Sequence, residues 1–387
     1  MKLLEYKAWE LFKKYQIPVM PGAVVDNVEE IADRIEEANL SYPVVVKAQV
    51  QIGGRGKAGG IKFADNAAQA KEIANSMLFS EVRGLKVRQL LLAQCAEIVQ
   101  ECYLSFMLDR ESRSTIIIFS AMGGMDIEET AKTDPDKIVK LAVDPDLGIQ
   151  DYDVRYLLDK SSMDAALLPQ LRDILRKLYR MYLDYHCLLA EINPLAIVKD
   201  GRLVALDGKV DIDDSALYLL PDMQEFKELI SIDSHPLVSE AGKYNFLYIP
   251  IADKGNVVAM SNGSGMLMNC VDRIVDKGLP VSAAMDLGGG ATAERIREAT
   301  RILLATPDTK ILFASIFGGI TRCDEVAKGI RDGLADSGKD VDIVIRVEGT
   351  NRDLGVGILN EIPGRVHIVN WPHEGVLLLE QIGGVEQ

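Results

Sequence analysis

One short pattern recurs through the C-terminal part of the chain, and this repeat restricts the fold more than any other feature. From about residue 255 onward, a short apolar run, a loop containing glycine or asparagine and an amphipathic helical stretch follow one another. The apolar runs are NVVAM, VSAAM, KILFASI, VDIVIRV and RVHIV. Strands that alternate with helices pair in parallel, and runs this apolar are buried on both faces. The pattern predicts a parallel sheet with helices on both sides.

The loops of this repeat are candidates for ligand binding. The expected arrangement is similar to the doubly wound sheet of flavodoxin-like domains, in which ligands bind where the carboxyl ends of strands meet helix N-termini. One glycine there can be a turn requirement only, whereas several such loops indicate backbone amides gathered around an anion. A dinucleotide site is disfavoured, because no loop has the G-x-G-x-x-G pattern with a following acidic residue. The glycine and asparagine residues concerned are Asn262, Gly263, Gly265, Gly288 to Gly290, Gly318, Gly319, Gly349 and Asn351.

The N-terminal part of the chain mixes helices and hairpins, which is typical of an α+β domain. The polar segment LLPDMQEFKELISIDSHPLVSEAG, which contains two prolines, is expected to connect it to the α/β part. We therefore expect two domains, residues 1–236 and 237–387. The periodicity predicts helices at 2–15, 27–38, 66–77, 152–158 and 164–185, and strands at 43–50, 60–64, 88–93, 101–109, 114–120, 192–198 and 202–207.

Charge and composition narrow the possible partners. Asp and Glu outnumber Lys and Arg by 58 to 43, and a net charge of -15 disfavours nucleic acid and anionic membranes as partners. The N-terminus, MKLLEYKAWELFKKYQ, predicts an amphipathic helix rather than a signal peptide, and no run of about 18 apolar residues occurs. The expected location is the cytoplasm. The five cysteines and four histidines lack the spacing of a metal site.

The segment EINPLAIVKDGRLVALDGKV predicts a hairpin with an amide opposite a carboxylate. With its turn near residue 200, Asn193 pairs with Asp207 to within about one residue. Mg²⁺ accepts such oxygens and completes its shell with water and substrate phosphates. A polar cross-strand pair on a solvated face is the alternative. Glu191 lies on the same face and adds a second carboxylate, unless Lys209 on the neighbouring strand neutralises it.

The stretch GGRGKAGG at residues 53–60 suggests phosphate binding. It is not a Walker P-loop, because Ala58 follows Lys57 and a strand, not a helix, comes next. A glycine-rich flap between antiparallel strands can lay backbone amides over phosphates, with Lys47 on the strand before it. A mobile surface loop is the alternative. The flap, the lysine and the hairpin pair together are the parts of a phosphoryl-transfer site outside the P-loop class.

Over nearly its whole length the chain resembles the β subunits of succinyl-CoA synthetases, in which an ATP-grasp domain is joined to a CoA-ligase domain. The resemblance lies in the order and spacing of EYKAWELFKKYQIPVMPG, VVVKAQVQIGGRGKAGG, LLAEINPL, LVALDGKV, SNGSGMLM, DLGGGATAERI and IFGGITRCDEVAKGI. It implies a nucleotide site, a Mg²⁺ site, a position near the phosphohistidine and an organic-acid site. The residues implied are, in that order, Lys47, Gly54, Arg55, Gly56 and Glu101; Asn193 and Asp207; Glu191; and Asn262, Gly319, Ile320 and Thr321.

The resemblance also implies that this chain is half of an enzyme. In that family the phosphohistidine and the main CoA site belong to an α subunit, and no histidine here lies in a glycine-rich loop. We expect ATP or GTP and Mg²⁺ on this chain, CoA mainly on the α subunit, and a heterodimer or heterotetramer. The expected substrate is a dicarboxylic acid, with succinate as the first candidate.

Departures from the family pattern keep the specificity open. Ala93 and Ala96 stand where the family has glutamate and threonine near the nucleotide base, so base recognition either rests on backbone groups or differs. A non-catalytic regulatory subunit with a decayed nucleotide site is the corresponding alternative. Thr321 stands where an apolar residue is common, and its hydroxyl favours a substrate with an extra polar group, such as malate.

Overall fold

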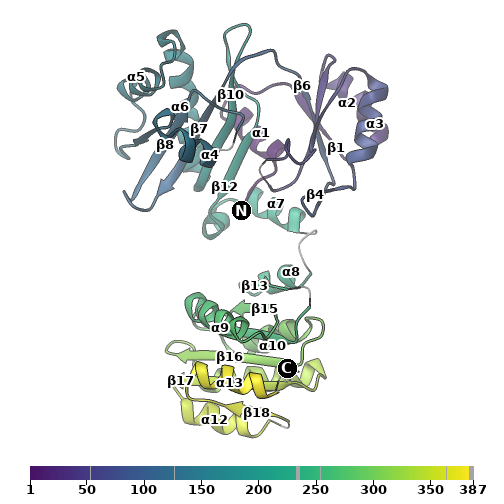
Figure 1. The fold of residues 1–387 in the computed structure, drawn as a ribbon, viewed down its shortest axis with the longest axis vertical. Helices are drawn as coiled ribbons and strands as arrows, with labels where there is room; N and C mark the ends of the chain where they lie inside the picture. Colours follow the sequence, from purple (N-terminus) through teal and green to yellow (C-terminus); the bar gives the residue numbers. More distant parts are fainter. Residues whose placement is uncertain (53, 126, 232–235, 253, 363, 383–387) are drawn as a thin grey trace. The chain divides into compact units, whose positions relative to one another are not determined.

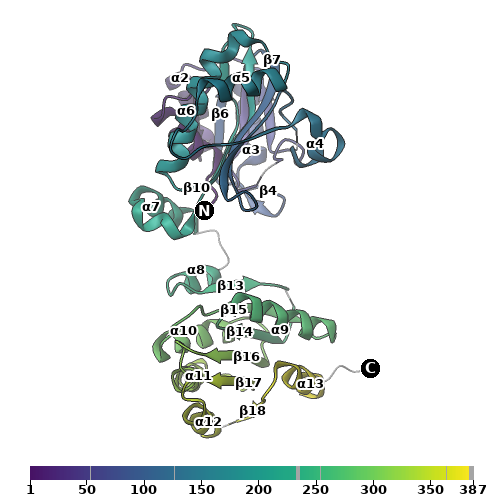
Figure 2. The same ribbon diagram turned by 90° about the vertical axis from the view of Figure 1, so that its left-hand side faces the viewer.

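The computed structural model describes residues 1–52, 54–125, 127–231, 236–252, 254–362 and 364–382. The chain divides into two compact units, residues 1–227 and 228–387 (Figures 1 and 2). The segment that we expected to connect the domains contains two helices, α7 (Pro221–Ser231) and α8 (Pro236–Gly242). Each begins at a proline, which is tolerated in the first helical turn, so prolines that suggested a break instead mark helix starts.

A four-stranded antiparallel sheet forms one half of the first unit. Two helices, α2 (Ile31–Glu37) and α3 (Ala67–Met77), cover one of its faces (Figure 1). Helix α3 presents Ala70 and Ala74 to the core, both fully buried, so the helix packs closely on the sheet. The strand order is β1 (Gly22–Val25), β6 (Leu90–Gln94), β2 (Val44–Ala48) and β3 (Ile61–Ala64), and a small hairpin of β4 (Glu81–Val82) and β5 (Leu85–Lys86) follows α3.

The other half of the first unit is a six-stranded antiparallel sheet. Helix α6 (Leu168–Asp184) lies along it and buries Leu171, Ile174, Leu175 and Leu178, which recur at the spacing of one helix face. Helices α5 (Asp151–Lys160), α4 (Ile127–Thr133) and α1 (Glu5–Lys14) complete this half, and α1 contacts both α6 and β12. The strands are β11 (Leu203–Ala205), β10 (Cys187–Val198), β7 (Ile98–Asp109), β8 (Ser114–Ser120) and β9 (Val139–Ala142), with β12 (Gly208–Ile212) also paired to β10.

The second unit is the predicted doubly wound domain. Its parallel strands follow the order 2-1-3-4-5, which is that of flavodoxin-like sheets, and a sixth, antiparallel strand that was not predicted lies at the edge. The strand order is β13 (Leu247–Pro250), β15 (Val281–Asp286), β14 (Val257–Ser261), β16 (Ile311–Gly318), β17 (Asp342–Gly349) and β18 (Val366–Ile368).

Helices cover both faces of this parallel sheet. One face carries α10 (Ala293–Leu304), α11 (Cys323–Ser337) and α12 (Arg352–Asn360), and the other carries α9 (Ser264–Asp276) and α13 (Pro372–Ile382) (Figure 2). None of the described helices combines the length and the apolar character needed to cross a membrane.

Candidate functional site

The hairpin places Asn193 and Asp207 opposite each other, as predicted. The backbone N–H of Asn193 donates to the carbonyl of Asp207 at 3.3 Å, and the ladder keeps the same register on both sides. The Asn193 side chain is held by the segment after β8: Oδ1 accepts from the N–H of Gly124 at 2.8 Å, and Nδ2 donates to the carbonyl of Met125 at 3.0 Å. The amide oxygen is therefore fixed in orientation, at the position opposite Asp207.

The glycine-rich turn directs one of its two cations inward. Arg55 is only 6% exposed, and its Nη2 donates to both carboxylate oxygens of Asp207 at 2.8 Å. The turn is closed by its own backbone, since the carbonyl of Arg55 accepts from the N–H groups of Ala58 and Gly60. Gly54 has φ +68°, a conformation that glycine adopts without steric strain. Lys57 is exposed and lies 3.9 Å from Glu129.

A buried carboxylate that the sequence did not single out joins these groups into one cluster. Glu5, at the start of α1, has a side chain that is 1% exposed; its Oε1 lies 2.8 Å from Lys47 Nζ and its Oε2 2.6 Å from Arg55 Nη1. Lys47 also donates to the carbonyl of Leu206 at 2.7 Å. We call Glu5, Lys47, Arg55 and Asp207 the charge cluster. Its two cations and two carboxylates balance.

Burial and mutual attraction compete in setting the pKa values of the charge cluster. Burial raises the pKa of Asp207 to about 6; the charge of Glu5 adds to this effect, whereas Arg55 and Lys47 oppose it. Burial acts in the same direction on Glu5, but Lys47 and Arg55 outweigh it and hold the pKa of that carboxyl below its usual range. Burial opposes the charge of Arg55, but Asp207 and Glu5 outweigh it and raise the pKa of Arg55 further.

A cavity of about 350 Å³ adjoins the charge cluster. Its described lining includes five of the predicted site residues, which are Gly54, Arg55, Glu191, Asn193 and Asp207. Cations and carboxylates both face it, with Lys2, Arg83 and Lys209 adding three positive charges and Glu5 one negative charge. The cavity thus offers cations and ordered oxygen ligands to a polyanion that arrives with a metal ion.

Glu191 also lies in the wall of this cavity. It is the direct cross-strand neighbour of Lys209, and both residues line the cavity. The hydroxyl of Tyr103 donates to Glu191 Oε2 at 3.1 Å, and burial, reinforced by the charge of Glu191, raises the pKa of Tyr103. Tyr103 was not predicted, because its apolar neighbours on β7 give it the pattern of a core residue.

The other predicted nucleotide residues lie on β6, on β7, in the loop between these strands and in the flap. Glu101 on β7 packs against Gly124, where a Cβ atom would approach Glu101 Oε2 to 2.0 Å, so the loop that fixes Asn193 also contacts this carboxylate. Gly56 lies in the exposed part of the turn. Ala93 is buried in β6 between β1 and β2, and Ala96 is half-buried against an apolar cluster on β10 and β11.

In the second unit, predicted residues join neighbouring loops at the carboxyl ends of the parallel strands. The amide of Asn262 exchanges two hydrogen bonds with the backbone of Phe317, at 2.9 and 3.0 Å. Thr321 is buried, and its hydroxyl accepts from the N–H of Gly290 at 2.9 Å. Ile320 is 87% exposed, next to Gly319 in the same loop. The hydroxyl of Thr321 is therefore engaged within the protein.

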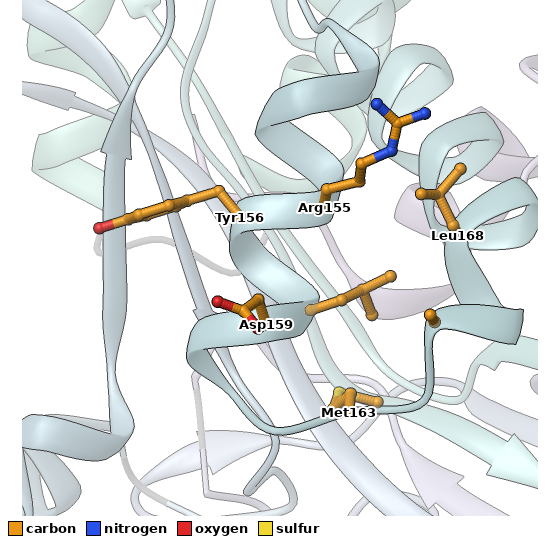
Figure 3. A pocket seen from close by; sticks show the side chains of 7 residues that line it. Arg155, Tyr156, Asp159, Met163 and Leu168 are labelled. Atoms are coloured by element: carbon orange, nitrogen blue, oxygen red, sulfur yellow. The ribbon is translucent and has the colours of Figure 1, made fainter.

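A second cavity in the first unit lies apart from these residues. It has a volume of about 420 Å³ and is lined by residues of α5 and the start of α6, among them Arg155, Tyr156, Asp159 and Leu168 (Figure 3). Its described lining contains none of the predicted site residues. The candidate site is the smaller cavity, because the charged side chains and the hairpin residues Asn193 and Asp207 line it.

Comparison with known families agrees with this architecture. Residues 2–197 match the ATP-grasp domain family, and residues 260–367 match the CoA-ligase family. The protein is thus an ATP-grasp protein with a C-terminal CoA-ligase domain, as the sequence resemblance implied.

Individual relatives define the family more closely. The chain is 41% identical over 365 residues to the succinate–CoA ligase (ADP-forming) subunit beta of Pyrobaculum aerophilum, covering 94% of each chain. It is 39% identical over 378 residues to the corresponding subunit beta 2 of Archaeoglobus fulgidus, covering 97% of each. This chain belongs to the family of succinate–CoA ligase β subunits. A structure of ATP citrate lyase from Methanothrix soehngenii shares the fold, with a TM-score of 0.77 over 99% of both chains at 20% identity.

Proposed function

We propose that this chain is the nucleotide-binding β subunit of an ADP-forming succinate–CoA ligase that is active with an α subunit. The observation that carries the proposal is the cavity in which Arg55, Asn193 and Asp207 meet under the glycine-rich turn. The names of the relatives in Pyrobaculum aerophilum and Archaeoglobus fulgidus support succinate as substrate and ADP as product.

The predicted residues in and around the cavity divide into nucleotide-binding and cation-binding groups. Lys47 and Arg55, with the backbone amides of Gly54 and Gly56, would contact the phosphates, and Glu101 would contact the rest of the nucleotide. Asn193 Oδ1 and the Asp207 carboxylate would hold Mg²⁺, a cation that takes only one or two protein oxygens in such sites. No described cluster of three or more His, Cys, Asp or Glu competes with this assignment. Bound there, Mg²⁺ supplies charge neutralisation to the phosphates.

The chemistry of the remaining steps belongs to the α subunit and to the second unit of this chain. The γ-phosphoryl group would pass from ATP to a histidine of the α subunit and then to a succinate carboxylate, and CoA would displace phosphate to form the thioester. Glu191 lies on the cavity wall at the position expected to face the histidine. Asn262, Gly319 and Ile320 would contact the acid, and the buried Thr321 would support their loop through its bond to Gly290.

The first test of this function separates binding from turnover. The isolated chain should bind Mg-ATP and Mg-ADP in a calorimetric titration, yet form succinyl-CoA only after the α subunit is added. Thioester formation by this chain alone, or the absence of nucleotide binding, would contradict the proposal. The second result would favour the decayed regulatory subunit, which the intact set of Lys47, Arg55, Asn193 and Asp207 argues against.

Substrate choice requires a comparison of acids and nucleotides. The malate hypothesis depended on a free hydroxyl at Thr321, and that hydroxyl is buried and bonded to Gly290. We therefore expect the reconstituted complex to use succinate in preference to malate. Ala93 and Ala96 both lie in apolar contacts, so we expect base selection to rest on backbone groups. Because the relatives are named ADP-forming, we expect ATP to be preferred to GTP when both are supplied in competition.

A further inference from the structure

The charge cluster contains two carboxylates, and they are held very differently. Glu5 is 1% exposed on its side chain and accepts from Lys47, Arg55 and, at 3.4 Å, Gln49. Asp207 is 28% exposed on its side chain and accepts from Arg55. Asp207 also lies opposite Asn193 in the hairpin, the residue with which it would share a cation, whereas Glu5 lies on α1. The cluster therefore has a fixed carboxylate and a releasable one.

The position of Glu5 is set by its helix. It is the first residue of α1, where the helix dipole favours a carboxylate. The next backbone N–H, that of Tyr6, donates to Gln49 Oε1 at 2.9 Å, so the helix end is bonded to the strand segment that carries Lys47. A carboxylate has two oxygens, and here each oxygen takes one cation. This arrangement sets the separation of Lys47 Nζ and Arg55 Nη1.

We infer that Glu5 is a positioning residue of the phosphate site. Its carboxylate holds Lys47 and Arg55 at a fixed separation and stays with them when Asp207 leaves Arg55 to hold a cation. Glu5 itself repels phosphate, because it is a negative charge within the site, so its contribution is to geometry and not to affinity. The inference rests on the proposed function, since it concerns the cations that would contact the transferred phosphoryl group.

Two substitutions remove the bridge in different ways. Glu5→Gln keeps the length but replaces one acceptor oxygen by an NH₂ donor, which must then face Lys47 or Arg55, both of them donors. Glu5→Asp keeps the charge but withdraws the carboxylate by one methylene, so it no longer reaches both cations. Glu10→Gln is the matched control, because Glu10 lies on the same helix, is exposed and pairs only with Lys7 in the described contacts.

The experiment measures turnover and binding separately. In the complex with the α subunit, both Glu5 variants should lower kcat by about tenfold or more, since displaced groups slow a positioned reaction strongly. The Kd of the full chain for Mg-ADP should stay within about threefold for Glu5→Asp and be equal or tighter for Glu5→Gln. Glu10→Gln should change neither quantity. Thermal unfolding of each variant identifies any that fails to fold. If one Glu5 variant does not fold, the inference is tested with the other.

Two results would overturn the inference. One is a kcat within about twofold of the unsubstituted complex, and the other is a Kd that weakens by the same factor as kcat falls, as expected of general structural damage. If the unsubstituted complex forms no thioester, the proposed function fails, and the role of Glu5 is then tested by the Kd for Mg-ADP alone. Lys47→Met should then weaken Mg-ADP binding while Glu5→Gln does not; equal weakening by both would refute the positioning role.

Discussion

Two neighbouring cations of the glycine-rich turn show how backbone geometry selects a functional side chain. Arg55 and Lys57 are two residues apart, yet Arg55 is buried against two carboxylates and Lys57 is exposed. The turn closes on the carbonyl of Arg55, which fixes that residue at the base of the turn and leaves Lys57 at its tip. The direction of the side chain, and not the identity of the charge, therefore decides which cation reaches the cavity.

The contact between Arg55 and Asp207 makes a prediction about metal binding in the absence of nucleotide. Arg55→Met frees the Asp207 carboxylate, so affinity for Mn²⁺ alone should rise several-fold, while affinity for Mg-ADP should fall by about tenfold, or about 1.4 kcal/mol. Electron paramagnetic resonance of free Mn²⁺ measures the first quantity and calorimetry the second. Lys47→Met is the control, because it removes the same charge from a residue that bonds to Glu5 and Leu206 instead. An equal rise in Mn²⁺ affinity in both variants would show that net charge alone is responsible.

Sequence reasoning identified some residues of the candidate site and missed others for one physical reason. The register of Asn193 and Asp207 followed from a short turn, so local geometry was sufficient. Glu5 and Tyr103 have local patterns of an ordinary helix start and an ordinary core strand, and their partners are distant in the sequence. Glu5 meets Lys47 only because α1 packs beside the hairpin and the first sheet, which no local pattern encodes.

Among the elements, those with a strong hydrophobic period were predicted, whereas several short and partly exposed ones were not. Four of the five parallel strands are almost entirely buried and β18 is half-buried, and the apolar composition of all five identifies them. The strands β1, β9 and β13 contain four residues each and are partly exposed, so neighbouring strands, rather than their own sequence, determine their pairing. Helix α4 was missed because it is short and polar.

The contact between α10 and α11 depends on Gly329, which has no side chain to separate the two helices. A Cβ atom at Gly329 would lie 2.5 Å from Ile296 Cβ and 2.7 Å from the carbonyl of Ala293. Gly329→Ala should therefore destabilise the second unit by about 1–3 kcal/mol, because the helices must separate. Gly357→Ala on α12 should instead stabilise it by about 0.5–1 kcal/mol, since nothing lies within 4 Å of the added atom.

Urea unfolding monitored by hydrogen exchange of α10, α11 and α12 measures the change in the free energy of unfolding for both variants. Opposite signs for the two glycines would support the close helix contact. A stabilising Gly329→Ala would show that helix propensity outweighs packing there.

At the scale of the whole chain, the candidate nucleotide site lies within one of the two units. The described lining of the 350 Å³ cavity comes from residues 2–209, all within the unit of residues 1–227. Each unit also has hydrophobic core clusters of its own. Nucleotide binding should therefore be a property of the first unit, whereas thioester formation should require the second unit and the proposed α subunit.

A fragment of residues 1–231 tests this assignment. It should bind Mg-ADP with a Kd within about threefold of that of the full chain, because every described wall residue is retained. The same fragment with Asp207→Asn, which removes the carboxylate, should bind Mg-ADP at least about tenfold more weakly. A folded fragment that shows no binding would mean that the second unit contributes to the nucleotide site.

The antiparallel strand β13 determines where the second unit can be cut. It pairs with residues 283–286 on the outer side of β15, with Leu247 opposite Asp286 and Pro250 opposite Ala283. The match to the CoA-ligase family begins at residue 260, beyond β13 and inside β14. An expression fragment that starts there would leave β15 with a row of unpaired backbone groups beside apolar side chains, which is a template for aggregation. A soluble second unit should begin no later than α8.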